Sequence, residues 1–218
     1  MELAKQCLDV GLYTNRYEEL RAFYVDQLGL AYEELLKVGG GVHQHRLAMN
    51  GSVLKLNSAR DPLADGPTNL LGFDIGMAVS EASVLTDPDG TKVGLMPSGS
   101  LCIHWASSDP ARLTELLVQG MGAVIEPNDT VRIGTTTLAL HGGGVPVGPL
   151  RCRGMRYLTV QVRDVRTEHA RLVGLGWREQ LAPVKLGETA FISFVTDPDG
   201  TPIEISQRAS LTGPLPVV

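Results

Sequence analysis

The stretch TDPDGTPIEISQ at Thr196–Gln207 repeats a corner that the chain has already used once, in TDPDGTKVGLMP at Thr86–Pro97. In Asp-Pro-Asp-Gly the proline presets φ for a turn, the aspartate bonds its own backbone, and the glycine accepts a positive φ. Apolar runs flank each copy, which predicts two β-hairpin turns. The second copy carries Glu204 where the first carries Gly94, so the two corners differ at one chemically important position.

The sequence around these corners repeats in the order β-α-β-β-β, which is the sign of a modular fold. The first unit begins with strand-like Leu8–Thr14, continues with helical spacing over Tyr17–Leu28 and ends in three short strand-like runs. The same order returns from Leu101 and again from Tyr157. Another unit is shortened, because only Ser80–Gly90 separates its first and last strands. We therefore predict three full βαβββ modules and one truncated module, the second along the chain.

The composition is that of an ordinary globular protein. The chain has 218 residues, of which 43% are hydrophobic and 20% are charged. Its net charge of −5 argues against a nucleic-acid partner, which normally requires a basic face. No apolar run reaches the length that spans a bilayer, so we expect no membrane partner. The three cysteines fit neither a disulfide framework nor a CxxC metal pattern, and the N-terminus lacks a signal-peptide pattern, so we expect a reduced, cytoplasmic protein.

Two motifs, AFYVDQLGL at Ala22–Leu30 and DPDGTPIEI at Asp197–Ile205, complete the pattern. Together with the repeated βαβββ order, they resemble the vicinal oxygen chelate superfamily, which includes glyoxalase I, bleomycin-resistance proteins and extradiol dioxygenases. The resemblance implies an α+β fold in which pairs of modules form curved, incomplete barrels around a pocket. It predicts an N-terminal glyoxalase-like half at residues 1–98, a C-terminal glyoxalase-like half at 99–210 and a tail at 211–218. The fold alone does not fix the reaction.

The resemblance also implies where metal ligands lie: a histidine on the first strand of a module and a glutamate on its last strand. Alternate residues of a strand share a face, so such positions converge on one ion. In the N-terminal half these positions hold Asp9 and Lys55, then Asp74 and Gly94. An ammonium group cannot ligate a metal. We therefore expect this half to be structural, with Lys55 in the place of an ion and paired with the two aspartates.

In the C-terminal half the same positions hold Cys102 and Leu138 in the third module and Tyr157 and Glu204 in the fourth. Glu204 is the one full match, and it is either a site carboxylate or a solvent-exposed strand residue. His104 lies on the same strand face as Cys102 and is either a ligand or proton carrier, or a core or rim residue. Tyr157 either donates a hydrogen bond to a ligand or fills the core.

The other residues capable of metal chemistry are expected to lie outside the site. Cys102 is predicted to be a small buried hydrophobe. His43 and His45 form a His-x-His pair that could chelate a metal, but their place on a middle strand favours a half-exposed pair. His141 precedes a run of glycines and is predicted to lie on the surface.

Two functions follow from the resemblance. The first is a glyoxalase- or dioxygenase-like enzyme, a lyase, isomerase or oxygenase that acts on a small organic molecule in a pocket of the C-terminal half. Glu204 would be its base or metal ligand, His104 its second metal ligand or proton carrier, and Tyr157 its hydrogen-bond donor. The cofactor would be a divalent ion (iron, zinc, manganese or nickel), or there would be none. The alternative is a metal-free protein that binds a small molecule, as resistance members of the superfamily do. The resemblance also implies a homodimer.

Overall fold

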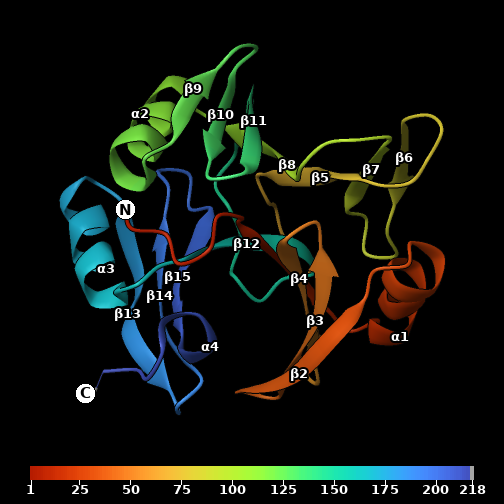
Figure 1. Ribbon diagram of the computed structural model, residues 1–218, viewed down its shortest axis with the longest axis horizontal. Helices are drawn as coiled ribbons and strands as arrows, with labels where there is room; N and C mark the ends of the chain where they lie inside the picture. Colours follow the sequence, from red (N-terminus) through yellow and green to blue (C-terminus); the bar gives the residue numbers. More distant parts are fainter. Residues whose placement is uncertain (217–218) are drawn as a thin grey trace.

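The computed structural model describes residues 1–216 and shows two curved sheets, of eight and seven strands (Figure 1). Three modules have the predicted βαβββ order, and the second module consists of three strands without a helix. The α+β fold of three full modules and one truncated module is therefore confirmed. Among residues 1–216, no helix combines the length and the apolar character that crossing a membrane requires.

The four modules follow one another along the chain. The first consists of β1 (Asp9–Thr14), α1 (Tyr17–Arg21) with its π-helical continuation η1 (Ala22–Gln27), β2 (Tyr32–Gly39), β3 (Val42–Met49) and β4 (Ser52–Ala59). The second consists of β5 (Leu70–Gly76), β6 (Ser83–Thr86) and β7 (Lys92–Met96). The third consists of β8 (Cys102–Ser107), α2 (Pro110–Met121), β9 (Val124–Glu126), β10 (Thr130–Ile133) and β11 (Thr136–Gly142). The fourth consists of β12 (Gly154–Gln161), α3 (Val165–Gly174), β13 (Arg178–Leu186), β14 (Ala190–Thr196) and β15 (Pro202–Arg208).

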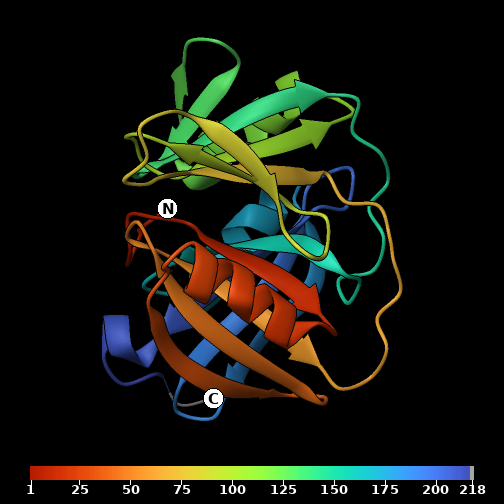
Figure 2. The ribbon, with the colours of Figure 1, turned by 90° about the vertical axis from the view of Figure 1, so that its right-hand side faces the viewer.

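The sheets do not group the modules in their order along the chain. The eight-stranded sheet has the order β13-β14-β15-β12-β1-β4-β3-β2 and joins modules four and one; we call it the outer-module sheet. The seven-stranded sheet has the order β6-β7-β5-β8-β11-β10-β9 and joins modules two and three; we call it the inner-module sheet. Figure 2 shows them as two layers, with the links at 60–69 and 143–153 running along one edge.

This grouping differs from the predicted one, in which modules one and two formed one half and modules three and four the other. Each sheet takes one module from either side of the boundary predicted at residue 98. The antiparallel pairs β1–β12 and β5–β8 join the modules at the centre of each sheet. Such long-range pairing leaves no local sequence pattern, which is why the modules could be recognised and their partners could not.

Local sequence rules explain the helix that precedes β9. The Asp109 side chain accepts a hydrogen bond from the Arg112 amide at 3.0 Å, and Pro110 occupies the first helical position, as predicted. Gly122 ends α2 with φ of 69°. The predicted apolar face is buried at Leu113 and at its neighbours one turn later, and it joins a hydrophobic cluster that includes residues of both sheets.

The two TDPDG corners have the same backbone but differ in one contact. Asp87 accepts the Thr91 amide at 2.8 Å, and Asp197 accepts the Thr201 amide at 2.7 Å. The second oxygen of Asp87 also accepts the Tyr24 hydroxyl at 2.8 Å. The second oxygen of Asp197 is buried and has no hydrogen-bond partner within residues 1–216. Burial consequently raises the pKa of Asp197 to about 6.

The C-terminal tail predicted at 211–218 begins inside a short helix, α4 (Ala209–Thr212). Leu215 beyond it is buried, so this part of the tail packs against the protein. Residues 217 and 218 lie outside the described part of the chain.

Candidate functional site

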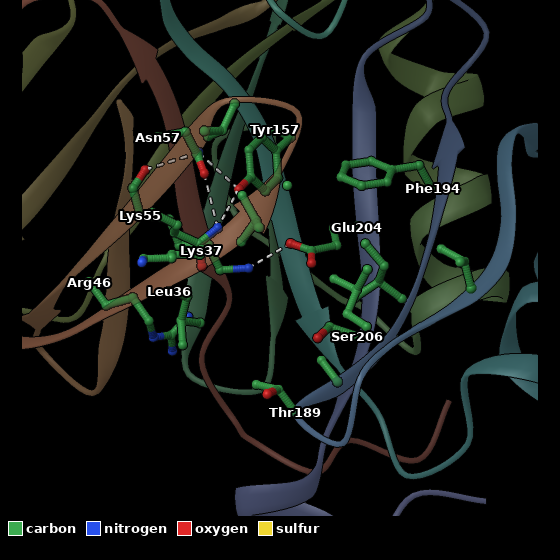
Figure 3. Close-up of a pocket in the computed structure, with 18 of the residues that line it drawn as sticks. Leu36, Lys37, Arg46, Lys55, Asn57, Tyr157, Thr189, Phe194, Glu204 and Ser206 are labelled. Carbon is green, nitrogen blue, oxygen red and sulfur yellow. Dashed lines mark hydrogen bonds and ion pairs between the residues drawn. The ribbon is translucent and has the colours of Figure 1, made fainter. Parts of the chain in front are cut away.

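A cavity of about 730 Å³ lies against the outer-module sheet, between the strands of module one and those of module four (Figure 3). Its volume falls in the range of small-molecule sites. Strands β2, β3, β4, β12, β13, β14 and β15 all contribute to its walls. Its apolar lining consists mainly of aliphatic strand residues and one phenylalanine: Leu35, Leu36, Val38, Val42, Leu150, Leu181, Val184, Leu186, Ile192 and Phe194.

A buried ion pair joins the two modules inside this cavity. Lys55 Nζ on β4 lies 2.6 Å from Glu204 Oε2 on β15, across the two central strands of the sheet (Figure 3). The Thr159 hydroxyl lies 2.6 Å from each of these atoms. Lys55 is 2% exposed and Glu204 7%, so Glu204 is not a solvent-exposed strand residue. Burial lowers the pKa of the Lys55 ammonium, while the carboxylates of Glu204 and Asp9 limit that shift.

Tyr157 stands beside the ion pair on β12 and depends on a glycine opposite. A Cβ at Gly11 would lie 2.1 Å from the Tyr157 ring, so only glycine leaves room for that ring. The Tyr157 hydroxyl accepts hydrogen bonds from Asn57 Nδ2 at 3.1 Å and from Gln44 Nε2 at 3.4 Å. Burial raises the pKa of Tyr157 well above its ordinary value, and the negative charge of Glu204 adds to the shift. The side chain is therefore a neutral phenol near neutral pH.

The four positions at which the resemblance implied metal ligands in modules one and four all lie in the outer-module sheet. Lys55, Tyr157 and Glu204 line the cavity, whereas Asp9 belongs to another group of contacts. The Asp9 carboxylate accepts Lys5 Nζ at 2.7 Å and a backbone amide at 3.0 Å. Lys55 is thus bound to Glu204 rather than held between the two aspartates that the sequence suggested.

The third predicted site residue lies in the other sheet. His104 is on β8, where its Nε2 lies 3.0 Å from Asp74 Oδ2 and its Nδ1 lies 3.1 Å from His141 Nε2. The structure brings Tyr157 and Glu204 together and leaves His104 outside the cavity that they line. The reason is the strand pairing, which assigns the third and fourth modules to different sheets. The hollow shared by all three residues does not form.

Strand register corrects two of the ligand positions that the resemblance assigned to modules two and three, in the inner-module sheet. In the outer-module sheet, each last-strand position pairs with the residue two places after the first-strand position. In module two, Gly94 pairs with Asp74, so the first-strand position is Gly72 and not Asp74. In module three, the same rule selects Ala139 and not Leu138, which is fully buried in the core. Most of the equivalent positions in this sheet therefore carry no ligand.

The cavity residues do not fit the divalent ion that the resemblance implied. Two of the positions hold an ammonium and a neutral phenol, and neither is a ligand of such an ion. The Glu204 oxygen that faces Lys55 already accepts two hydrogen bonds. Lys55 balances the glutamate charge instead, and a metal shared by Glu204 and His104 would require residues that lie in different sheets.

The sequence pattern of the Glyoxalase/Bleomycin resistance protein/Dioxygenase superfamily matches residues 6–205. The chain belongs to this superfamily. The match covers all four modules and confirms the resemblance inferred from the two motifs and the repeated order.

Solved structures of the superfamily share the fold at low sequence identity. Glyoxalase I from Zea mays is 14% identical, with 92% of each chain covered and a TM-score of 0.73. A putative dioxygenase from Bacillus subtilis subsp. subtilis str. 168 is 12% identical, with 95% of this chain and 85% of that chain covered and a TM-score of 0.67. No curated protein matches the sequence. At such identities the likeness establishes the fold and not the reaction.

Several polar residues of the cavity were not predicted from the sequence. Asn57 lies two residues after Lys55 on β4, so strand alternation could have placed it on the same face. Gln44 and Arg46 alternate in the same way on β3. Their position opposite β4 follows from the register of that hairpin and from its attachment to β1, which the sequence does not specify.

Proposed function

We propose that the protein binds a small organic anion in the cavity of the outer-module sheet without a metal ion. The observation that carries this proposal is the Lys55–Glu204 ion pair at the positions where the superfamily resemblance implied metal ligands. The pair holds the two modules together at the centre of the cavity and leaves the remaining volume to a ligand. Sequestration by a metal-free protein was the alternative function in the sequence analysis, and the geometry of this pair favours it.

The charges of the cavity select an anion, although the whole chain carries a net charge of −5. Its lining includes five cationic side chains: Lys37, Arg46, Lys55, Arg151 and Arg208. Glu204 pairs with Lys55, and Glu34 is shared by Arg46 at 3.0 Å and Arg208 at 2.8 Å. Two carboxylates thus pair with three of the five cations, and a concave site with such an excess of positive charge attracts an anionic ligand.

The rest of the lining indicates a ligand with an apolar body. Tyr13, Val42, Tyr157 and Phe194 belong to a small hydrophobic cluster at one side of the cavity. The rings of Tyr157 and Phe194 lie 5.6 Å apart in an edge-on arrangement that suits a further aromatic or aliphatic group. The Tyr157 oxygen accepts two amide donors, so its proton is directed to an acceptor such as a ligand carboxylate.

Catalysis by proton transfer is the second candidate function. Burial lowers the pKa of Lys55, and its ammonium contacts both Glu204 and Thr159, which gives a route for moving a proton at the cavity wall. In this case Glu204 is the base and Tyr157 the hydrogen-bond donor, as the superfamily resemblance implied. This candidate predicts turnover of a bound compound, which sequestration does not.

The test is a panel of monocarboxylates (hexanoate, octanoate, benzoate and naphthoate) and their neutral amides, measured by thermal shift and calorimetry on tag-free protein. We expect the apolar carboxylates to bind, the amides to bind at least tenfold more weakly, and a chelator to change nothing. Tyr157→Phe should weaken binding at least tenfold, since one hydrogen bond to a charged group is worth about 1.5–3 kcal/mol. Tyr32→Phe is the matched control, because the Tyr32 hydroxyl contacts His45 outside the cavity.

Three results would overturn the binding proposal: equal binding of acids and amides, loss of binding with chelator, or no binding of any carboxylate in the panel. Chemical change of a bound acid that stops in Glu204→Gln while binding persists would establish the catalytic candidate instead.

A further inference from the structure

Three side chains with metal-binding atoms gather at the centre of the inner-module sheet. Asp74 on β5 pairs across the strands with Cys102 on β8, and His104 follows two residues later on the same face. One ligand atom from each residue lies within 4.8 Å of the other two. No second group of three histidine, cysteine or acidic residues with this spacing occurs within residues 1–216. Cys102 was expected to be a buried hydrophobe, but it is half-buried and has a free thiol.

The spacing of these atoms is close to that of ligands around one ion. The nitrogen Nε2 of His104 lies 3.0 Å from Oδ2 of Asp74. Two ligands of a tetrahedral zinc ion, each bound at about 2.0–2.1 Å, lie roughly 3.3 Å apart. A change of a few tenths of an ångström would therefore convert this hydrogen bond into a shared metal contact.

The orientation of the imidazole is fixed from its other side. The nitrogen Nδ1 of His104 lies 3.1 Å from Nε2 of His141 on β11, and the two rings are stacked with centroids 5.4 Å apart. A histidine that ligates a metal commonly has its second nitrogen held by a hydrogen bond, which sets the ring orientation. His141, which the sequence placed on the surface, is exposed and supplies this contact.

Gly94 makes room for the carboxylate of the cluster. A Cβ at Gly94 would lie 2.0 Å from Asp74 Oδ1, so a side chain here would displace that oxygen. Glycine at this position, where the second corner carries Glu204, leaves the carboxylate in its observed place. The side chains of His104 and Asp74 are 33% and 21% exposed, so an ion can reach them from solvent without complete burial of charge.

We infer that Asp74, Cys102 and His104 form a binding site for a transition-metal ion, with zinc as the best fit. Oxygen, nitrogen and sulfur donors together suit zinc and its borderline neighbours, whereas magnesium and calcium take oxygen ligands. Cys102 coordinates as a thiolate and releases its proton to solvent. Three protein ligands leave a fourth position for water or a small ligand.

This site is separate from the cavity of the outer-module sheet and does not depend on the function proposed for it. It also differs from the predicted metal site, in which His104 was paired with Glu204, and from the superfamily positions as strand register corrects them. Register assigns those positions in the inner-module sheet to Gly72, Gly94, Cys102 and Ala139. Cys102 is the one residue common to both sets, and Asp74 and His104 each lie two residues away from a superfamily position.

The experiment uses the tag-free full chain, stripped with chelator under reducing conditions, and titrates it with zinc against a chromophoric chelator. We expect one zinc per chain. Cobalt in place of zinc should give the sulfur-to-cobalt charge-transfer absorption of a thiolate ligand. Cys102→Ser should abolish that absorption, and Cys102→Ser, His104→Gln and Asp74→Asn should each weaken zinc binding at least tenfold.

Two matched controls test whether other thiols or imidazoles bind the ion. Cys7→Ser removes a half-buried free thiol outside the cluster, and His43→Gln removes part of the His-x-His pair on β3. Neither should alter zinc affinity or the cobalt spectrum. The inference is overturned if the folded protein binds no zinc at micromolar concentration. It is equally overturned if binding survives in all three cluster variants or is lost in His43→Gln.

Discussion

The two sheets share one architecture but use the same strand positions differently. The outer-module sheet fills its four first- and last-strand positions with polar or charged residues: Asp9, Lys55, Tyr157 and Glu204. The inner-module sheet fills the equivalent positions with small residues: Gly72, Gly94, Cys102 and Ala139. Its polar groups, Asp74 and His104, lie two residues away on the first strands.

The difference shows that the side chains on one face of a module can change while its backbone stays the same. The strand ladders and the core on the other face hold each sheet together, so a residue facing the hollow alters chemistry without altering the fold. In the outer-module sheet the charges are buried and must pair, whereas in the inner-module sheet they are half-exposed and can remain open to an ion.

Lys55→Met is expected to have the largest effect on stability. It leaves the buried Glu204 carboxylate without its cation, which should lower the free energy of unfolding near neutral pH by about 3–5 kcal/mol. Adding Glu204→Gln to Lys55→Met should recover most of the loss. The counterpart in the inner-module sheet, His104→Gln, should cost less than about 1 kcal/mol, because the His104–Asp74 pair is partly solvated. Urea unfolding measures all three, and equal losses for Lys55→Met and His104→Gln would contradict the contrast.

The second prediction concerns the two TDPDG corners and their dependence on pH. A carboxyl whose pKa is raised in the folded state adds stability below its unfolded pKa of roughly 3.9. That stability is lost as pH rises through about 6, the pKa of Asp197. In total Asp197 should therefore lower the free energy of unfolding by about 2–3 kcal/mol between roughly pH 3 and pH 7.5, a range that spans its unfolded and folded pKa values.

Asp197→Asn should remove this part of the pH dependence, which unfolding free energies at several pH values will show. Asp87→Asn is the matched control in the inner-module sheet. Burial raises the pKa of Asp87 too, but the Tyr24 hydrogen bond opposes the shift. The loss of stability that Asp87 causes across the same pH range should therefore be smaller. A larger pH effect for Asp87→Asn than for Asp197→Asn would show that the unpartnered oxygen is not the cause.

The smallest expected effect compares two glycines. Gly11→Ala places a Cβ 2.1 Å from the Tyr157 ring, which is rigid and buried, and should cost about 1–3 kcal/mol of stability. Gly94→Ala meets the partly exposed Asp74 carboxylate, which can rotate into solvent, and should cost less than about 1 kcal/mol. Thermal unfolding measures both. If Gly94→Ala is the more damaging change, Asp74 is held more firmly than its exposure indicates.

Local patterns in the sequence were sufficient for the modules themselves. Turn chemistry at Asp87 and Asp197, the cap at Asp109 and the helical spacing of α2 are all set by residues close together in the chain, and each appears as predicted. Counting these units gave three full modules and one truncated module, and two motifs indicated the superfamily to which the chain belongs.

The sequence also identified Tyr157 and Glu204 as candidate site residues, and both line the cavity. It also named Lys55 but paired it with Asp9 and Asp74 instead of Glu204, and it did not separate His104 from the cavity, because both depend on which modules share a sheet. That choice is made by backbone pairing and apolar burial between strands more than a hundred residues apart, such as β1 and β12. The sequence by itself determined the units and their corners; only the tertiary structure decided which residues face the same hollow.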